Sequence, residues 1–220
     1  MSLKLYHFAP SPPSRCALLT ARALDLDIEV KVINLFAKEQ LTEEFISTNP
    51  QHCVPTLDDK GFILWESRAI SGYLVSKYGK DDTLYPNEPQ KRAEVDRLLY
   101  FDAGTLFPRM RAIAFPVLFL GEKKVTQEKK DSLNQAFGYL ETFLEGKKWL
   151  AGGDHFTIAD ISNVSSTSSF LAVGWNIDAF PNVKKWVENC AKSIPGYEEN
   201  KQGAEIFGGA VASKLDAGEI

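Results

Sequence analysis

Two serines frame a proline pair near the start of the chain, in Ser11-Pro12-Pro13-Ser14-Arg15. The segment separates a strand-like stretch from a helix-like one, so it is predicted to begin a helix. A helix start offers free N–H groups and the positive end of a dipole, which stabilise an anion such as a thiolate. Cysteines at positions 11 and 14 would form a redox dithiol, but two hydroxyls cannot form a disulfide. One hydroxyl could donate a hydrogen bond to a substrate's sulfur. Spacing alone favours simple helix capping.

A second candidate segment, residues 49–57, reads Asn-Pro-Gln-His-Cys-Val-Pro-Thr-Leu. Pro55 opens a strand, where its missing N–H is tolerated. A cis bond at Val54-Pro55 would turn the backbone N–H and C=O of Val54 outward, ready to pair with a bound peptide. Because only about 5% of X-Pro bonds are cis, spacing alone favours trans. His52 could hold a carboxylate, although a lone surface histidine is more often incidental.

The third segment is Trp65-Glu66-Ser67-Arg68, where a strand gives way to a helix. A carboxylate could dock on the helix N–H groups at Ser67, with Arg68 adding positive charge. Glu66 supplies a negative charge suited to an amine. The pattern fits an amino-acid zwitterion, and it fits equally well a capped helix with a solvated charge pair.

The elements that must position these segments follow from the hydrophobic spacing. Strands are expected at 3–8, 28–33, 55–58 and 62–65, the last two joined by a hairpin turn at 59–61. Helices are expected at 14–25, 39–48 and 66–78. In the second of these, Leu41, Phe45 and Ile46 should share one side. The order is β-α-β-α-β-β-α, and the three candidate segments lie at its junctions.

The remainder of the chain is predicted to be helical. Helices are expected at 89–120, 126–145, 157–172 and 181–192, followed by a looser final segment with a mobile tail at 208–220. Thr157 and Asp160 form a capping box at one helix start. The expected organisation is therefore an α/β domain at 1–80, a linker at 81–88 and an all-α domain at 89–220.

Composition excludes several functional classes. The chain has 220 residues with a net charge of −4, 44% apolar and 25% charged residues, which is ordinary globular usage and argues against a nucleic-acid surface. Three cysteines do not make a disulfide framework. No run of about 18 apolar residues indicates a membrane helix, and no secretory signal is visible. A cytoplasmic protein with no membrane or nucleic-acid partner is expected.

Together the three segments resemble the cytosolic glutathione transferases, with the greatest similarity to the insect delta and epsilon classes. The resemblance is carried by residues 49–78, with Leu-Trp-Glu-Ser-Arg-Ala-Ile and Tyr-Leu-Val-Ser-Lys-Tyr-Gly near their end. It continues through Asp82-Thr83-Leu84-Tyr85-Pro86, residues 99–106 and Phe156-Thr157-Ile158-Ala159-Asp160. It covers roughly residues 3–200.

The resemblance implies an N-terminal thioredoxin-like domain, a C-terminal helical bundle and a homodimer. It makes Ser11 the donor to the glutathione sulfur, with Ser14 the weaker choice, and implies a cis-proline at Pro55. The glutathione-binding set it implies is Gln40, His52, Cys53, Val54, Pro55, Glu66, Ser67 and Arg68. Gln40 replaces a histidine common in the delta class, and the Cys53 thiol itself is expected to be structural. Cys16 and Cys190 are expected to be small core residues.

The chemistry requires no general base, metal or cofactor, because glutathione is itself a co-substrate. A thiol with a pKa near 8.5 is only about 7% ionised at about pH 7.4. Lowering that pKa by about two needs roughly 2.7 kcal/mol of preferential stabilisation. A hydrogen bond to a charged acceptor supplies about 1.5–3 kcal/mol, and a helix dipole about 0.3–1 kcal/mol.

The electrophile should be apolar and lie against the helical half. Candidate walls are Phe107, Met110, Ile113, Phe115, Phe119 and Phe207, although ordinary core packing is an alternative for each. Arg109 and Arg111 could polarise an electrophile or be solvated. The expected function is conjugation of hydrophobic electrophiles in detoxification of xenobiotics or lipid peroxidation products, with peroxidase, dehydrohalogenase or isomerase activity open. Alternatives are a non-catalytic carrier and a thiol–disulfide oxidoreductase.

Overall fold

A four-stranded mixed sheet forms the centre of the first half of the chain in the computed structural model, which describes residues 3–220. The strands are β1 (Leu3–His7), β2 (Ile28–Val32), β3 (Thr56–Asp59) and β4 (Phe62–Trp65), in the order β2-β1-β3-β4. β1 is parallel to β2, while β3 is antiparallel to both β1 and β4. The predicted βαβαββα order is confirmed.

The hairpin between β3 and β4 turns on two residues. Lys60 and Gly61 both have positive φ, 57° and 99°, which is typical of the type I′ turn that matches strand twist. The Asp58 carboxylate accepts a 2.7 Å hydrogen bond from the Gly61 N–H. This turn sets the register that brings the end of β4 to the start of the next helix.

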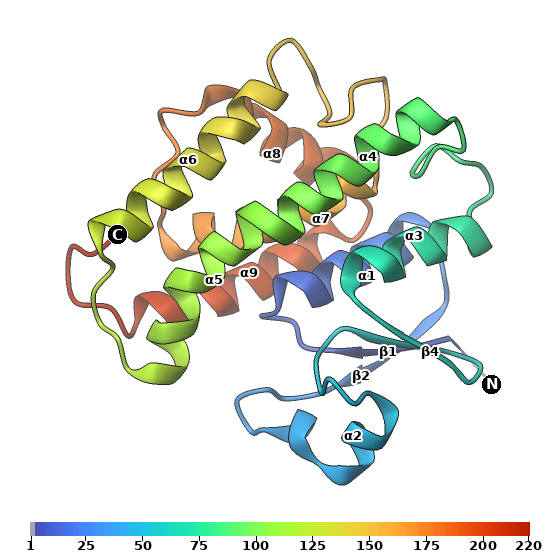
Figure 1. Cartoon of the computed structure of the whole chain (residues 1–220), viewed down its shortest axis with the longest axis horizontal. Coiled ribbons are helices and arrows are strands. Elements are labelled where there is room, and N and C mark those ends of the chain that lie inside the picture. Colours follow the sequence, from blue (N-terminus) through green and yellow to red (C-terminus); the bar gives the residue numbers. More distant parts are fainter. Residues whose placement is uncertain (1–2) are drawn as a thin grey trace.

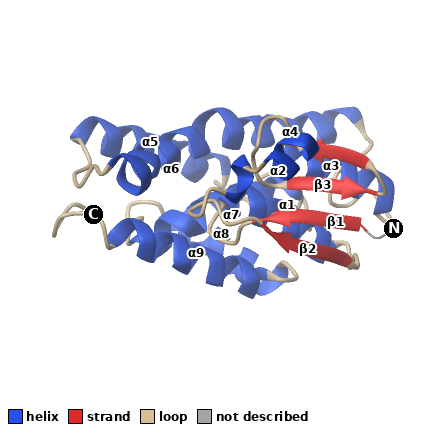
Figure 2. Ribbon diagram, turned by 90° about the horizontal axis from the view of Figure 1, so that it is seen from below, coloured by secondary structure: helices blue, strands red, loops and turns tan. Residues whose placement is uncertain are grey.

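Helices cover both faces of the sheet (Figures 1 and 2). α1 (Pro12–Ala23) and α3 (Ser67–Tyr78) lie side by side between the sheet and the helical half, and α2 (Glu43–Thr48) lies on the opposite face. The predicted helix at 39–48 is wrong in part: a 3₁₀ turn, Glu39–Leu41, precedes α2, because Thr42 is extended and caps α2. Leu41 and Ile46 remain exposed, and only Phe45 is buried.

The helical half begins with a continuous helical run over residues 89–120. It comprises α4 (Pro89–Phe101), a π-helical turn η2 (Asp102–Leu106), α5 (Phe107–Phe115) and a second π-helical turn η3 (Pro116–Leu120). The predicted single helix lacked these interruptions. Pro108 and Pro116 lack an N–H, and their rings crowd the carbonyl four residues earlier. The regular α-helical hydrogen-bond pattern therefore cannot continue through them.

α7 (Ile158–Val173) is the central helix of this half and is buried along most of its length. It begins at the predicted Thr157–Asp160 capping box, where the Asp160 carboxylate accepts from the Thr157 N–H at 2.8 Å. α6 (Gln127–Phe143), α8 (Pro181–Ser193) and α9 (Tyr197–Ala212) surround it. The largest apolar core lies around α7 and includes Cys16 and Cys190 as predicted.

The final segment is more ordered than predicted. α9 is a regular helix packed on α7, so closely that a Cβ on Gly208 would lie 2.3 Å from the Ala172 carbonyl oxygen. Beyond it, the Asp216 N–H donates to the Lys123 carbonyl, and the Glu219 carboxylate accepts from the Val125 N–H. The expectation of a looser final segment was wrong for Tyr197–Ala212, because the long-range partners of this helix cannot be read from local composition.

The run Pro89–Leu120 is long enough, and its most apolar part has enough mean hydropathy (1.2), to cross a membrane by length and composition alone. In the folded chain its apolar side chains Val95, Leu98, Leu106 and Met110 pack into the helical core. One face of this run therefore packs in the helical core, while 28% of its most apolar part is buried.

Candidate functional site

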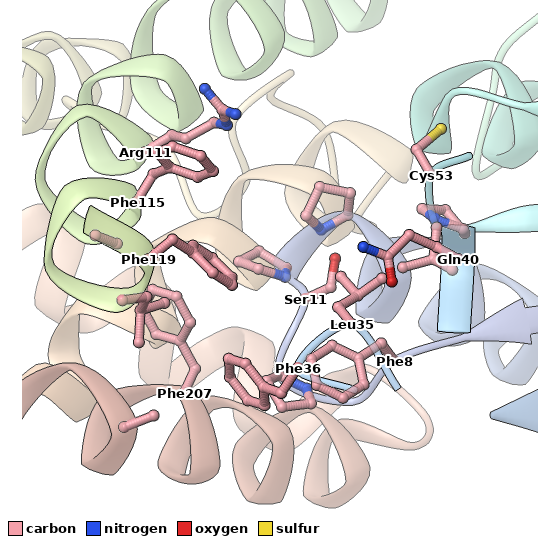
Figure 3. A pocket seen from close by; sticks show the side chains of 18 of the residues that line it. Phe8, Ser11, Leu35, Phe36, Gln40, Cys53, Arg111, Phe115, Phe119 and Phe207 are labelled. Carbon is pink, nitrogen blue, oxygen red and sulfur yellow. The ribbon is translucent and has the colours of Figure 1, made fainter. Parts of the chain in front are cut away.

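Ser11 is the N-cap residue of α1, and its hydroxyl faces a large cavity between the two halves (Figure 3). Its Oγ accepts a long hydrogen bond, 3.4 Å, from the Ser14 N–H, and its own N–H donates to the Phe8 carbonyl at 2.9 Å. Within residues 3–220 the hydroxyl proton of Ser11 has no acceptor. It is therefore available to a ligand in the cavity.

The start of α1 offers fewer amide donors than a typical helix. Pro12 and Pro13 occupy its first two positions and have no N–H, and the next N–H, that of Ser14, already bonds Ser11. The expected free N–H groups for an anion are therefore missing here. Any anion at this helix start depends chiefly on the Ser11 hydroxyl and the helix dipole.

Ser14 has a different environment. Its side chain is fully buried, and its Oγ accepts a 3.3 Å hydrogen bond from the Phe8 N–H. It does not line the cavity. The geometry thus separates the two serines: one faces the cavity, and the other stabilises the turn that leads into α1.

A buried arginine fixes this turn from behind. Arg15 is 2% exposed, and its Nη1 donates to the carbonyl oxygens of Ala9 and Pro10 at 2.9 and 3.0 Å. Its remaining donors bind the helical half: Asn200 Oδ1, the Ser165 carbonyl and the Ser169 hydroxyl. Burial lowers the pKa of Arg15 to about 9, so the guanidinium remains charged at neutral pH.

The loop before β3 supplies a backbone edge to the cavity. The Val54–Pro55 bond is cis, as the family resemblance implied and as spacing alone did not. Asn49 orders the loop by donating to the Cys53 carbonyl at 3.2 Å and to Thr56 Oγ1 at 2.8 Å. Among residues 3–220 nothing bonds the Val54 N–H or C=O, so both are free for a peptide ligand.

The start of α3 combines an acid with a cation that is already paired. Glu66 caps α3 with a positive φ of 71° and makes no side-chain capping bond. Arg68 Nη2 lies 2.5 Å from the buried Asp102 carboxylate. Although burial lowers the pKa of Arg68, Asp102 raises it above its ordinary value. Ser162 and Ser166 also donate to Asp102. Arg68 is therefore held by the helical half, and Glu66 is left facing the cavity.

The cavity measures about 1100 Å³ and brings together nearly all of the predicted site. Its peptide-like edge comprises Ser11, Gln40, His52, Cys53, Val54, Pro55, Glu66, Ser67 and Arg68. Its apolar side comprises the predicted Phe107, Met110, Phe115, Phe119 and Phe207. Ile113 is the exception: it is 1% exposed, packs in the helical core and does not line the cavity. Its side of α5 faces inward rather than toward the cavity.

Several lining residues were missed by the sequence analysis. They are Phe8, Leu35, Phe36, Lys38, Leu41, Leu118, Ala210, Ser213 and Lys214. Arg111, which was expected either to polarise an electrophile or to be solvated, also lines the cavity. Phe8 ends a predicted strand and Phe36 lies beyond the next one, so neither belongs to a predicted site segment. Lys214 comes from the segment predicted to be mobile. No local signal places these residues opposite one another.

The thiols are poor candidates for redox chemistry. Burial raises the pKa of Cys53, which is half-buried, and of Cys16 and Cys190, which are fully buried. Because the thiolate is the reactive form, a raised pKa makes each thiol less reactive. In the part of the chain that the structure describes, no cluster of three histidine, cysteine or acidic residues could hold a metal ion.

Comparison with known proteins supports the same arrangement. Residues 1–76 match the model of the glutathione S-transferase N-terminal domain, and residues 102–193 match that of the C-terminal domain. The chain is 43% identical to glutathione S-transferase D7 of Anopheles gambiae over 98% of this chain and 99% of the relative. The protein belongs to the glutathione S-transferase family.

Solved structures of the family extend the match to three dimensions. Glutathione S-transferase unclassified 2 from Bombyx mori is 55% identical, with a TM-score of 0.94 over 98% of this chain and 100% of that one. A glutathione transferase homolog from Drosophila mojavensis with bound glutathione is 42% identical, with a TM-score of 0.93 over 97% and 98%. Delta-class and epsilon-class insect enzymes are also similar. The expected family, classes, thioredoxin-like domain and helical domain are confirmed.

Proposed function

We propose that this glutathione S-transferase binds glutathione along the peptide-like edge of the cavity. The free N–H and C=O of Val54 pair with the cysteinyl part, Glu66 and Ser67 receive the γ-glutamyl end, and His52 and Gln40 contact the glycine end. A Drosophila mojavensis relative was solved with bound glutathione, which supports glutathione as the ligand. The thiol of glutathione then lies beside the Ser11 hydroxyl.

In this proposal Ser11 keeps the thiol ionised by donating a hydrogen bond to the sulfur. Since Pro12 and Pro13 supply no amide donors, the hydroxyl provides most of the stabilisation that lowers the thiol pKa. A hydrogen bond to a charged acceptor contributes about 1.5–3 kcal/mol, which corresponds to lowering the pKa by about one to two. The helix dipole adds about 0.3–1 kcal/mol.

The thiolate attacks an electrophile held against the aromatic side of the cavity, and glutathione is consumed as co-substrate without a cofactor. Xenobiotics and lipid peroxidation products are the substrates we propose, in a cytoplasmic detoxification role, with hydroperoxide reduction as a side activity. The single observation that carries the proposal is the Ser11 hydroxyl, which faces the cavity with its proton unbonded.

Replacing Ser11 by Ala tests the mechanism. Ultraviolet titration of the glutathione complex should give a thiol pKa about one to two higher in the variant, and turnover of an aryl halide at pH 6.5 should fall at least tenfold. Glutathione binding, measured by calorimetry, should persist. Unchanged ionisation and turnover would remove Ser11 from the mechanism. A wild-type protein that binds glutathione but never turns over would be a carrier instead.

We also propose a homodimer. Phe62 on β4 is 50% exposed and its ring lies tilted against that of Tyr73, with centroids 5.2 Å apart, and Tyr100 on α4 is 77% exposed. Large aromatic side chains left in water are typical of surfaces that pair with another subunit. Sedimentation should give twice the 24.5 kDa chain mass, and a monomer at micromolar concentration would contradict the proposal.

A further inference from the structure

A continuous row of rings lines the apolar side of the cavity (Figure 3). Phe8 contacts Phe36 edge-on at 5.3 Å between centroids, Phe36 lies 6.0 Å from Phe119, and Phe119 lies 5.1 Å from Phe115. The row begins at the end of β1 and ends on α5. It presents faces and edges that suit a flat, conjugated ligand.

A guanidinium ends this row. Arg111 lines the cavity with its Cζ 4.4 Å from the centroid of the Phe115 ring. Across residues 3–220 it forms neither a hydrogen bond nor an ion pair, so all five of its N–H donors are available. A cation that rests on a ring and lacks a carboxylate partner is poised to accept an anion.

A second cation lies on the same side of the cavity. Lys214, two residues beyond α9, lines it and donates to the Leu118 carbonyl at 2.8 Å. It forms no ion pair among the described residues, and Glu122 and Asp216 line a neighbouring pocket with it. The cavity contains one acidic residue, Glu66, which belongs to the peptide-like edge. The charged residues that line the apolar side of the cavity are therefore the cations Arg111 and Lys214, although the chain as a whole carries a net charge of −4.

Arg109, two residues before Arg111 on α5, has a structural role. It does not line the cavity, and its Nη1 donates to the Ser132 carbonyl at 2.7 Å and to Gln135 Oε1 at 3.0 Å. Its donors serve the packing of α5 on α6. Arg111 makes no such contact among the described residues, so its donors are free for a ligand.

We propose that the preferred electrophiles are flat aromatic or conjugated molecules that carry an anionic group, and that Arg111, assisted by Lys214, determines this preference. The inference rests on the proposed transferase function. The row of rings receives the apolar body, and the carboxylate or sulfonate binds the guanidinium. This places the electrophilic carbon between the rings and the glutathione sulfur.

A matched pair of substrates measures the preference: para-chloro-meta-nitrobenzoate and its neutral carboxamide. In both, the sulfur forms a bond to the ring carbon that bears chlorine, and chloride leaves with the bonding pair. The ratio of kcat/KM for the carboxylate to that for the amide is determined in wild type and in each variant, so intrinsic differences in ring reactivity cancel.

In Arg111→Gln the ratio should fall about fivefold or more, and in Arg111→Gln/Lys214→Gln further. Arg109→Gln is the control on the same helix, and its ratio should equal that of the wild type. Raising ionic strength to about 0.5 M should lower the wild-type ratio more than that of the double variant. An equal ratio in wild type, Arg111→Gln and the double variant would overturn the proposal.

A binding measurement separates this proposal from the catalytic one. Fluorescence titration with anilinonaphthalenesulfonate and neutral N-phenylnaphthylamine, in the presence of unreactive S-methylglutathione, gives the same comparison without turnover. A preference for the sulfonate that Arg111→Gln removes would support the proposal even if neither chloronitrobenzene derivative reacts. Absence of turnover in the wild type would count against the transferase function alone, and absence of the sulfonate preference would overturn the role of Arg111.

Discussion

Arg15 Nη2 donates a hydrogen bond to the carbonyl oxygen of Ser165, 2.9 Å away and 150 residues further along the chain. The same guanidinium binds the carbonyls of Ala9 and Pro10, the two residues that precede Ser11. One buried side chain thus links α7 to the turn that carries the proposed sulfur-binding hydroxyl. The position of that hydroxyl is coupled to the docking of the two halves.

Replacing Arg15 by Met should destabilise the protein and displace the Ser11 turn. The variant leaves buried carbonyls without donors, at a cost of about 1–3 kcal/mol for each group that finds no water. Arg15→Lys, with three donors in place of five, should have an unfolding free energy between those of Arg15→Met and the wild type. Urea unfolding measures stability, and titration of bound glutathione reports the hydroxyl's position. A Met variant that matches the wild type in both would contradict this coupling.

Gly203 should not tolerate even a methyl group. A Cβ there would lie 2.4 Å from the Ala9 carbonyl oxygen and 2.6 Å from Arg15 Cδ. Gly203→Ala should therefore cost about 1–3 kcal/mol of unfolding free energy, the range for overpacking, and should reduce turnover. Gly209→Ala is the matched control in the same helix, since its Cβ would contact nothing within 4 Å. That variant should be as stable as wild type, or more stable by up to about 1 kcal/mol. Equal melting temperatures for both variants would refute the close approach.

Ser14→Ala should affect folding rather than chemistry. The change removes the acceptor of the Phe8 N–H and should lower the unfolding free energy by about 1 kcal/mol. Thermal unfolding measures that loss. The bound thiol should still ionise as in the wild type, in contrast to Ser11→Ala. If Ser14→Ala raised the thiol pKa and Ser11→Ala did not, the roles of the two serines would have to be exchanged.

His7 should make the fold sensitive to mild acid. Burial lowers the pKa of this 5% exposed side chain from 6.5 to about 4, with Arg15, Arg22 and Glu199 as the charged groups around it. Below about pH 6.5 His7 is protonated in the unfolded chain but stays neutral in the folded chain. The free energy of unfolding therefore falls as the pH drops from 6.5 to 4. The loss approaches about 1.4 kcal/mol per pH unit, or roughly 3 kcal/mol in total.

His7→Phe should flatten this part of the stability profile, measured by urea unfolding between pH 4 and 7. The control is His155→Gln, which changes an exposed histidine and should leave the slope unaltered. A wild-type profile that is already flat over this range would show that His7 titrates normally in the folded protein.

The peptide-like edge could be predicted because its residues lie at junctions between strands and helices. Ser11, Pro55 and Glu66 each follow or begin an element, so a short sequence window contains both the residue and its structural setting. The resemblance to known transferases then supplied what spacing could not, including the cis bond at Pro55. The local sequence pattern and the family similarity therefore pointed to the same residues along the peptide-like edge.

The apolar side was harder to predict because tertiary packing decides which residues of a helix face the cavity. Ile113 and Met110 have similar apolar character, yet only Met110 lines the cavity. Arg15 had the sequence signature of an ordinary helix arginine, and its partners on α7 and α9 lie 150 or more residues away. Pro108 and Pro116 were the overlooked local signal, since η2 ends two residues before Pro108 and η3 begins at Pro116.

The hydrogen bonds of Asp216 and Glu219 to the stretch after η3 have a practical consequence for preparing this protein. An affinity tag fused behind Ile220, or clipping by a carboxypeptidase, would disturb the segment next to Leu118 and Phe119 while sparing the peptide-like edge of the cavity. Recombinant samples differing only in their last few amino acids could then rank xenobiotics differently. Assays of acceptor preference should accordingly use an untagged C-terminus and verify the intact mass.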